Sequence, residues 1–320
     1  MKKNTYKYLF GPVPSRRLGR SLGVDLTPFK TCSFDCIFCQ LGRTTRKTLT
    51  RKEYVPVDKV IAELDEWLKT DNSADYITLS GSGEPTLNSE FGRVIDFVRN
   101  ATTIPVVLLT NASLLSDPEV RAQAAQANVV KVSLSAWDQF SLEHINRPHR
   151  DIAFKRLIEG QWLFRKEFKG QLWMEVFLVW GTNTTAKDVS SIAELVKAVE
   201  PNKVQLNTAV RPPCEEYAYA VPEDQMGALA RLFDPPAEVI AEYSSDASAK
   251  VQANESDILG MLKRRPCTLD QICRVFELHK NEASKYLGKL TRTGQARERR
   301  KAGEVYFSAI RGKDAEHANV

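Results

Sequence analysis

The stretch Cys32-Ser-Phe-Asp-Cys36-Ile-Phe-Cys39 decides how the rest of the chain is interpreted. Its three cysteines are spaced C-x3-C-x2-C on a predicted loop that follows a strand-like run over 22–26. Three thiolates leave a structural zinc ion one ligand short, because such sites use four. They can instead bind three irons of a four-iron, four-sulfur cluster and leave the fourth iron open to a non-protein ligand. The alternatives are three unrelated buried cysteines and a zinc loop that borrows a distant histidine.

Short apolar runs alternate with helical patterns along the first three quarters of the chain. The predicted strands cover 22–26, 76–79, 106–109, 129–134, 174–180 and 204–206. The predicted helices cover 57–69, 89–99, 118–127, 152–168, 188–199 and 222–232. This alternation predicts an α/β fold with a parallel sheet and helical crossovers. The sheet can curl into a partial barrel that binds ligands at the C-terminal ends of its strands, but a flat doubly wound sheet has the same pattern.

Polar residues follow the predicted strands, where the chemistry of such folds lies. The second strand is followed by Ser80-Gly-Ser-Gly-Glu84, whose glycines let the backbone approach a ligand closely. Glu84 offers an acceptor for an ammonium group, although a glycine-rich turn with a surface glutamate is the simpler interpretation of this segment alone. After the sixth strand, Arg211 can pair bidentately with a carboxylate. Whether cofactor or substrate owns that carboxylate is left open.

Together, the cysteine loop and the glycine–glutamate segment resemble the radical S-adenosylmethionine (AdoMet) superfamily. The resemblance implies a partial (β/α)6 barrel, a [4Fe–4S] cluster on Cys32, Cys36 and Cys39, and AdoMet on the open iron. Ser82 and Ser135 depart from the pattern, since many members have glycine and an acid there. The AdoMet-contacting residues expected from the strand ends and the resemblance are Phe38, Gly81, Gly83, Glu84, Asn111, Ser133, Ser135, Asn207 and Arg211.

Residues 8–28, with these two loops, resemble the branch grouped with wybutosine-synthesis-like radical AdoMet proteins, over roughly 8–235. The tRNA wybutosine synthases carry a further cysteine set upstream, whereas 1–31 here contains no cysteine, so that reaction is not carried over. The resemblance implies reductive cleavage of AdoMet to a 5′-deoxyadenosyl radical that abstracts hydrogen from a substrate. The substrate is unidentified, with an RNA nucleoside or a peptide favoured, and no catalytic residue is assigned. A flavodoxin- or ferredoxin-like one-electron donor is the expected partner.

A second module is predicted after Pro235-Pro236 and an Ala/Ser-rich segment over 243–253. We therefore expect a barrel over 1–235, a linker over 236–254, a winged helix-turn-helix domain over 255–312 and a tail over 313–320. Helices at 255–264, 268–276 and 279–290 and a hairpin of 295–300 with 304–309 support this. Nucleic acid, or a peptide or protein, is the expected partner of this module. The cations expected to contact phosphate are Lys280, Lys285, Lys289, Arg292, Arg297, Arg299, Arg300 and Lys301.

Charge is unevenly spread although the net charge is only +5. Residues 1–52 carry twelve Lys/Arg and two acids, and residues 255–312 carry thirteen and seven. This distribution indicates either a surface for an anionic partner or compensation of an anionic cluster and the AdoMet carboxylate. Cys214, Cys267 and Cys273 are too scattered for a second cluster and are expected to be buried thiols.

Two further expectations concern location and the competing function. The sequence has no apolar stretch of membrane-spanning length and no apolar signal-peptide core near its start, so we expect a cytoplasmic protein without a membrane partner. The competing function is an iron–sulfur redox sensor that binds DNA through the winged helix. Release of 5′-deoxyadenosine after anaerobic reduction separates the two, because a sensor needs no AdoMet cleavage.

Overall fold

The computed structural model describes residues 6–15, 18–70, 73–240, 255–276, 278–301 and 303–310. An eight-stranded sheet in the order β1-β2-β5-β6-β7-β8-β9-β10 forms its centre. The six strands from β2 to β9 are parallel to one another, and β1 is antiparallel to β2. The strands are β1 Leu9–Ser15, β2 Gly19–Val24, β5 Tyr76–Leu79, β6 Val106–Thr110, β7 Val129–Ser133, β8 Gln171–Leu178, β9 Lys203–Thr208 and β10 Glu238–Val239.

All six predicted strands are present in the predicted order, and each of the six predicted helices is found. Within the described residues β1 and β10 are the two edges of the sheet, which therefore does not close on itself. The helices around it are α1 Val57–Thr70, α2 Phe91–Ala101, α3 Pro118–Ala124, α4 Gln139–Ile145, α5 Phe154–Glu167, α6 Ala186–Val199 and α7 Glu223–Ala230, with a 3-10 turn, η1, at Pro85–Leu87.

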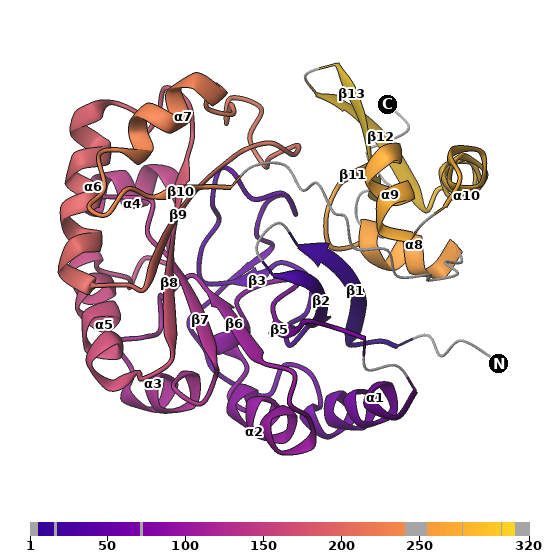
Figure 1. Ribbon diagram of the computed structural model, residues 1–320, viewed down its shortest axis with the longest axis horizontal. Coiled ribbons are helices and arrows are strands. Elements are labelled where there is room, and N and C mark those ends of the chain that lie inside the picture. Colours follow the sequence, from indigo (N-terminus) through magenta and orange to yellow (C-terminus); the bar gives the residue numbers. More distant parts are fainter. Residues whose placement is uncertain are drawn as a thin grey trace.

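The helices cover one face of the sheet, which distinguishes a curled barrel from a doubly wound sheet (Figure 1). Buried side chains of α1 to α7 share one apolar cluster with alternate residues of the strands, such as Leu22, Ile77 and Leu108. A doubly wound sheet would bury both faces under helices. Here the opposite face of the sheet is the inner surface, hereafter the lumen, so the sheet has the partial-barrel form.

The lumen is apolar at one end and polar toward the other. Side chains alternate between the two faces of a strand, so the residues between the helix-facing ones point into the lumen. Val107, Val129 and Trp173 form a small apolar cluster near the starts of their strands. One layer further along, Lys131 forms a 2.9 Å ion pair with Glu175. The polar residues thus increase toward the C-terminal ends of the strands.

Strand β1 was not predicted, because its sequence Leu-Phe-Gly-Pro-Val-Pro-Ser contains two prolines. Proline has no N–H to donate and is confined to edge strands and bulges. β1 satisfies both conditions, since it pairs only with β2 and its register shifts between Phe10 and Val13. The prolines argue against a strand in the local sequence, but they are tolerated here because β1 lies at the edge of the sheet.

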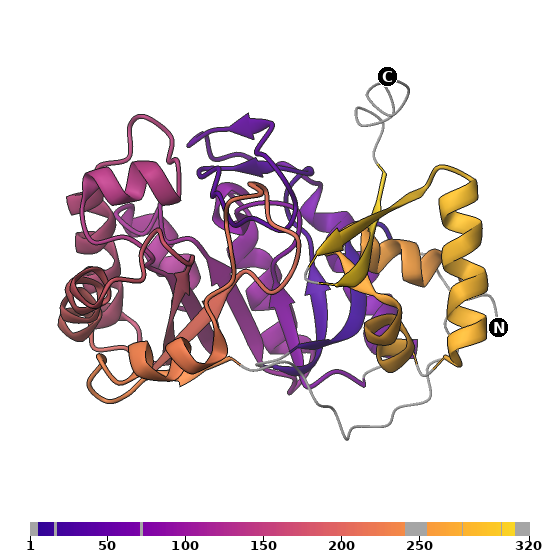
Figure 2. The same cartoon turned by 90° about the horizontal axis from the view of Figure 1, so that it is seen from above.

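Residues 255–310, hereafter the C-terminal module, form a second apolar core. Three helices accompany a small antiparallel sheet of order β11-β13-β12, and the module lies beside β1 (Figures 1 and 2). These elements agree with the predicted helices and hairpin, while the winged-helix assignment stays a prediction. The predicted tail over 313–320 and most of the predicted linker lie outside the described residues. The elements are α8 Glu255–Leu262, β11 Cys267–Thr268, α9 Leu269–Phe276, α10 Lys280–Arg292, β12 Ala296–Lys301 and β13 Glu304–Ala309.

None of the described helices combines the length and apolar character needed to cross a bilayer.

Candidate functional site

The cysteine loop is fixed at the C-terminal end of the barrel by backbone hydrogen bonds. Its first cysteine lies on β3 (Thr31–Cys32), which pairs with β4 (Arg46–Lys47). Further along, the Ile37 N–H donates to the carbonyl of Ile145 at 3.0 Å. The Cys39 N–H donates to the carbonyl of Cys36 at 3.1 Å and tightens the turn. The three sulfurs are thereby held on a short, braced segment.

Each sulfur of the loop has a nitrogen donor nearby. The Lys30 ammonium lies 3.2 Å from the Cys39 Sγ, and the Asn146 Nδ2 lies 3.3 Å from the Cys36 Sγ. Asn111 Nδ2 is more distant from the Cys32 Sγ, at 3.6 Å. N–H donors aimed at cysteine sulfurs are a common means of tuning iron–sulfur clusters.

The chemistry of these thiols fits a metal cluster. Burial raises the pKa of the Cys32 thiol to about 12, and burial also raises the pKa of Cys36. Both are neutral as free thiols, and a metal would bind them with release of protons. Within the described residues no three His, Cys, Asp or Glu side chains converge on one ion.

Lys30 is the residue of this site that sequence reasoning missed. It is 3% exposed and adopts a left-handed backbone conformation, with φ of 54°. Burial acts to lower its pKa, but attraction to the thiolate forms of Cys39, Cys32 and Cys36 outweighs burial, and the pKa is raised. The Lys30 ammonium is therefore a buried positive charge next to the cysteine sulfurs. In the sequence it is one of twelve cations within the first 52 residues, and nothing marks it out.

The glycine–glutamate segment packs directly against the cysteine loop. The Ser82 carbonyl accepts a hydrogen bond from the Lys30 N–H at 2.7 Å, and the Glu84 N–H donates to the Thr31 carbonyl at 3.2 Å. A Cβ added at Gly83 would lie 1.8 Å from the Thr31 carbonyl oxygen, so no other residue fits there. The two predicted motifs, about forty residues apart, therefore form one structure.

Asp25 is a second residue that the sequence did not predict, and it hydrogen-bonds the glycine–glutamate segment. Its carboxylate accepts a hydrogen bond from the Ser82 N–H at 2.9 Å and another from the Ser82 hydroxyl. Gly81 has a φ of +143°, and an added Cβ would lie 2.6 Å from the Asp25 Cγ. Burial raises the Asp25 pKa, and the charge of Arg264 opposes that shift. Ser82, a departure from the family pattern, is thus explained by its bonds to Asp25.

Glu84 is buried beneath the segment after β6 rather than open to solvent. Its Oε1 accepts from the hydroxyls of Thr86 and Thr110, at 2.7 and 2.6 Å, and from the Thr86 N–H at 3.2 Å. Of the donors in the described part of the chain, its Oε2 accepts the Asn111 N–H alone, at 2.8 Å. An ionised carboxylate has about four acceptor positions, so Oε2 retains capacity for one more donor. If Glu84 binds the AdoMet ammonium, as predicted, Oε2 is therefore the oxygen that can accept it.

Asn111 and Ser133 lie where the sequence predicted them, at the C-terminal ends of β6 and β7. The Asn111 Nδ2 donates to the Ser33 hydroxyl at 2.9 Å, which joins it to the cysteine loop. Ser135 is buried, and its hydroxyl oxygen accepts the Phe177 N–H at 3.0 Å. The Ser135 hydroxyl keeps its O–H to donate, and its ribose contact stays a prediction.

The remaining predicted residues lie around the same end of the barrel. The Phe38 ring stacks on Phe177 with centroids 4.0 Å apart, so its packing role is established while an adenine contact stays a prediction. The Asn207 Nδ2 lies 3.4 Å from the Glu175 carboxylate in the lumen. The Arg211 guanidinium lies 3.4 Å from the side-chain oxygen of Gln40, directly after Cys39. Phe38 and Arg211 therefore lie at the cysteine loop, whereas Asn207 lies in the lumen beside Glu175.

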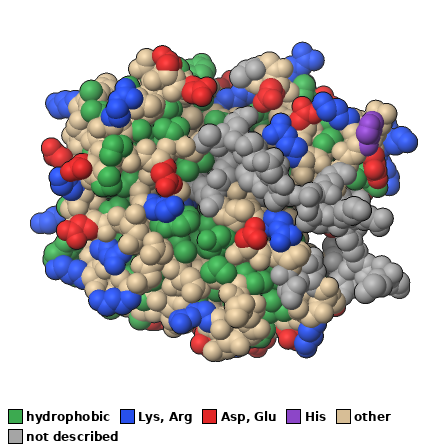
Figure 3. Space-filling view, viewed as in Figure 1, with side chains coloured by type: hydrophobic (Ala, Val, Ile, Leu, Met, Phe, Trp, Pro, Cys, Tyr) green, Lys and Arg blue, Asp and Glu red, His purple; other side chains and the backbone are tan. Residues whose placement is uncertain are grey.

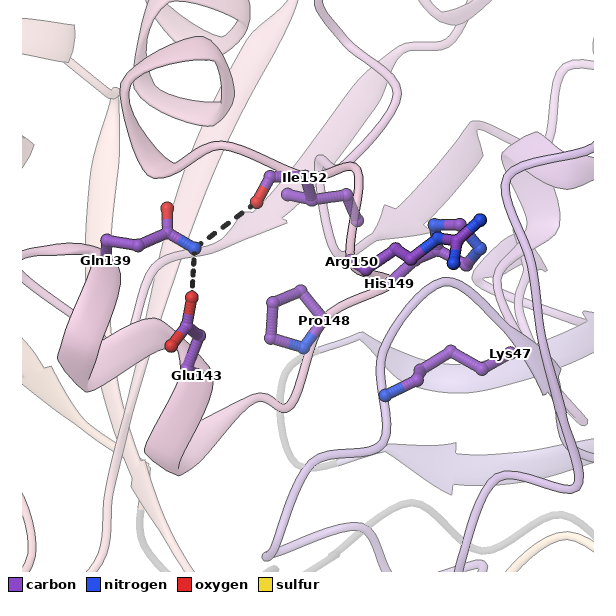
Figure 4. A pocket seen from close by; sticks show the side chains of 7 residues that line it. All are labelled: Lys47, Gln139, Glu143, Pro148, His149, Arg150 and Ile152. Atoms are coloured by element: carbon purple, nitrogen blue, oxygen red, sulfur yellow. Dashed lines mark hydrogen bonds between the residues drawn. The ribbon is translucent and has the colours of Figure 1, made fainter.

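A polar pocket of about 600 Å³ lies on the outer side of the cysteine loop (Figure 4). Lys47, His149 and Arg150 line one side, and Gln139 lies on the other, hydrogen-bonded to Glu143 at 2.8 Å. The pocket is tied to the loop because the His149 N–H donates to the Ser33 carbonyl at 2.8 Å. Two cations, Lys47 and Arg150, and one carboxylate, Glu143, line it, and Asp151 lies 3.8 Å from the Arg150 Nε.

The cations predicted to contact phosphate are largely engaged within the chain. Lys280 pairs with Asp270 at 2.7 Å and Lys289 with Glu255 at 2.6 Å. Arg299 and Lys301 donate to main-chain carbonyls of the barrel. On the face seen in Figure 3, basic and acidic side chains are interspersed over the module. These contacts weaken the case for nucleic acid as the partner of this module.

The chain is similar to proteins of one superfamily. The family model described as the Radical SAM superfamily matches residues 26–196. The UPF0026 protein MJ1312 of Methanocaldococcus jannaschii is 30% identical over 321 residues, which cover 97% of this chain and 98% of that protein. A Brachyspira hyodysenteriae protein named GTPase Obg is 37% identical over 297 residues, or 91% of this chain. The chain spans only 44% of that protein.

A solved structure gives the same indication for the fold. The crystal structure of a radical SAM methyltransferase from Sphaerobacter thermophilus matches with a TM-score of 0.50 at 20% identity. The match covers 68% of this chain and 65% of that one. The shared architecture is the mostly parallel α/β sheet described above.

Proposed function

The chain belongs to the Radical SAM superfamily and to the UPF0026 proteins, and on this premise we propose that it is an enzyme that cleaves AdoMet reductively. The superfamily's cofactors are the two predicted from the sequence, a [4Fe–4S] cluster and AdoMet. One observation supports the proposal above all: direct hydrogen bonds join the cysteine loop to the glycine–glutamate segment and to Asn111. The DNA-binding sensor has no support among the comparisons.

Each group of residues has a proposed task. Cys32, Cys36 and Cys39 would ligate three irons, and the open iron with AdoMet would supply a 5′-deoxyadenosyl radical for hydrogen abstraction. The glycine–glutamate segment and Asn111 would orient AdoMet over the cysteine loop. The stacked rings of Phe38 and Phe177 would exclude water on one side. The wybutosine-like branch assignment stays a prediction.

The test is anaerobic reconstitution followed by reduction in the presence of AdoMet. We expect about four iron and four sulfide per chain and release of 5′-deoxyadenosine, measured by chromatography. Full occupancy by zinc with no uptake of iron would refute the proposal. So would a reduced, fully loaded cluster that leaves AdoMet intact.

We further propose that the electron enters through the surface around the pocket of Figure 4. Lys47 is the register partner of Cys32 in the β3–β4 pair, so it lies one strand away from a predicted iron ligand. Arg150 is nearby, with a side chain 90% exposed. An acidic flavodoxin- or ferredoxin-like donor is complementary to this charge, and such complementarity speeds encounter.

Reversing these charges should slow reduction by a protein donor. We expect the double variant Lys47→Glu, Arg150→Glu to be reduced by flavodoxin about ten-fold more slowly at low salt, with the difference shrinking as salt is added. Reduction by dithionite should not change. The matched control is Lys166→Glu, Lys169→Glu, which alters exposed lysines just before the start of β8, at the opposite end of the barrel. Equal slowing in the control variant would contradict an entry surface at the pocket.

Lys30→Met should lower the midpoint potential of the cluster, because a nearby positive charge favours the reduced, more negative state. The Lys30 Nζ lies 3.2 Å from the Cys39 Sγ, and loss of a unit charge this close to a cluster ligand should lower the potential by on the order of 100 mV. A redox titration followed by electron paramagnetic resonance measures the shift. Lys47→Met is the control, because this exposed lysine is screened by solvent. An unchanged or higher potential in Lys30→Met would show that Lys30 has no electrostatic role.

A further inference from the structure

The C-terminal module spans the open side of the barrel. At one edge of the sheet, the Arg264 guanidinium lies 4.4 Å from the centroid of the Phe10 ring on β1. Val13, also on β1, packs against the apolar core of the module. A partial barrel leaves its lumen open between its edge strands, so this contact covers one border of the opening (Figure 2).

The module also contacts the segment that follows β9, near the other edge of the sheet. The Tyr306 hydroxyl donates to the Val210 carbonyl at 3.0 Å. The Lys301 ammonium donates to the Ala209 carbonyl at 2.6 Å and to the Arg211 carbonyl at 3.1 Å. Burial, with a smaller effect from Arg299, lowers the Lys301 pKa to about 8. The same segment carries the Arg211 side chain, so the module and this arginine are held together.

A cavity of about 340 Å³ lies between the lumen and the module. Its lining includes Ser21 and Thr78 of the lumen, Gly83 of the glycine–glutamate segment, and Met261 of α8. Ligand sites occupy about 300–1,000 Å³, so this volume admits a small molecule. The cavity is too small for a nucleic-acid strand or a folded peptide. Its lining includes Gly81, Gly83 and Arg211, which are also expected to contact AdoMet, so the cavity adjoins the proposed AdoMet site directly.

Positive charge dominates this cavity. Among the described residues that line it, Arg211, Arg264 and Arg265 are basic and none is acidic. The counter-charge beside Arg264 is Asp25, whose Oδ2 lies 3.7 Å from the Arg264 Nε. That separation is too long for a hydrogen bond, and among the described residues the buried Nε has no hydrogen-bond partner. The Asp25 carboxylate is meanwhile committed to Ser82. Arg264 therefore keeps donor capacity for a further anion.

We propose that this cavity is the substrate site, and that the substrate is a small molecule whose carboxylate or phosphate group is bound by Arg264 with Arg211. A guanidinium presents a planar set of donors that matches such oxyanions. The inference rests on the proposed function, since it takes the adjoining site to hold AdoMet. It replaces the RNA nucleoside and peptide favoured from the sequence with a smaller anion. The C-terminal module then serves as one wall of the site.

The test measures binding of two anions, inorganic phosphate and succinate, to the full chain with a reconstituted cluster. Isothermal titration is run with and without saturating AdoMet on three proteins: wild type, Arg264→Gln and Arg274→Gln. Arg274 is an exposed arginine on α9 of the same module that does not line the cavity. We expect one of the two anions to bind wild type in both conditions, which also distinguishes phosphate from carboxylate. Arg264→Gln should weaken that anion about ten-fold or more, and Arg274→Gln should not.

Several outcomes would overturn the inference. They are failure of both anions to bind wild type, equal affinity in Arg264→Gln, or displacement of the anion by AdoMet, which would assign the arginines to the AdoMet carboxylate. If Arg264→Gln does not fold, Arg264→Lys keeps the charge and should still weaken the anion, because lysine cannot form the bidentate contact. The assay needs no reductant, so the absence of 5′-deoxyadenosine would refute the proposed function and leave the anion result readable.

Discussion

Cys36→Ala is expected to hold no intact [4Fe–4S] cluster after anaerobic reconstitution and to release no detectable 5′-deoxyadenosine. The other two loop cysteines cannot compensate, because three thiolates already leave one iron without a protein ligand. The same loss is expected for Cys32→Ala and Cys39→Ala. Iron and sulfide analysis, the visible absorbance of the cluster and the nucleoside assay measure the effect together. This is the largest change expected from any single substitution in the chain.

Cys273→Ala is the matched control for this prediction. Cys273 is a partly buried thiol on α9 of the C-terminal module, outside the cysteine loop. Cys214→Ala and Cys267→Ala should likewise retain the cluster and the cleavage activity. Loss of iron in any of these three variants, or a full cluster in Cys36→Ala, would show that the ligands have been wrongly assigned.

The sequence could predict the six parallel strands because each contains a short apolar or β-branched run bounded by turn residues. Strands such as β6 and β7 are buried on the helix side and flanked by turn residues, and that pattern survives in the local sequence. It could also place the site, because ligands of such folds bind after the strand ends. Asn111 and Ser133 were predicted from this rule together with the resemblance to the radical AdoMet superfamily. The resemblance of the cysteine loop to the radical AdoMet superfamily then predicted the two cofactors, a [4Fe–4S] cluster and AdoMet.

The contacts that assemble the site could not be predicted, since they join residues far apart in the chain. The Asn146 amide contacts Cys36 across 110 residues, and Arg264 of the last module reaches Asp25 on the first part of the barrel. Lys30 has no sequence pattern of its own, because its importance comes from burial. Local periodicity carries no information about such pairings, whereas it fully determines which face of a strand is apolar.

Glu84 shows how the structure sharpens a prediction made from sequence. A surface glutamate could rotate to meet the AdoMet ammonium, but this carboxylate is 3% exposed and already accepts hydrogen bonds from Thr86, Thr110 and Asn111. Burial raises its pKa, and those hydrogen bonds oppose the shift by favouring the ionised form. The carboxylate can therefore act in two ways: by direct contact through Oε2, or by holding Asn111 against the cysteine loop.

Glu84→Ala should leave the cluster in place and weaken AdoMet binding. The lost charge-assisted contact is worth roughly 1.5–3 kcal/mol, which corresponds to about a ten- to hundred-fold loss of affinity. Equilibrium AdoMet binding to the reconstituted protein measures it, with iron content checked in the same samples. Unchanged affinity would remove Glu84 from the AdoMet site.

Thr110→Val separates the two ways in which Glu84 can act. It removes one donor to Oε1 at 2.6 Å but leaves the carboxylate charge and the Asn111 N–H bond to Oε2. If Oε2 binds the ammonium directly, Thr110→Val should retain most of the AdoMet affinity that Glu84→Ala loses. If the carboxylate acts only by fixing the segment after β6, both substitutions loosen that segment and the two losses should be similar. We expect direct binding, because Oε2 accepts the Asn111 N–H and has capacity for a second donor. Asn111 also bonds Ser33 of the cysteine loop, so this oxygen lies close to the proposed AdoMet site.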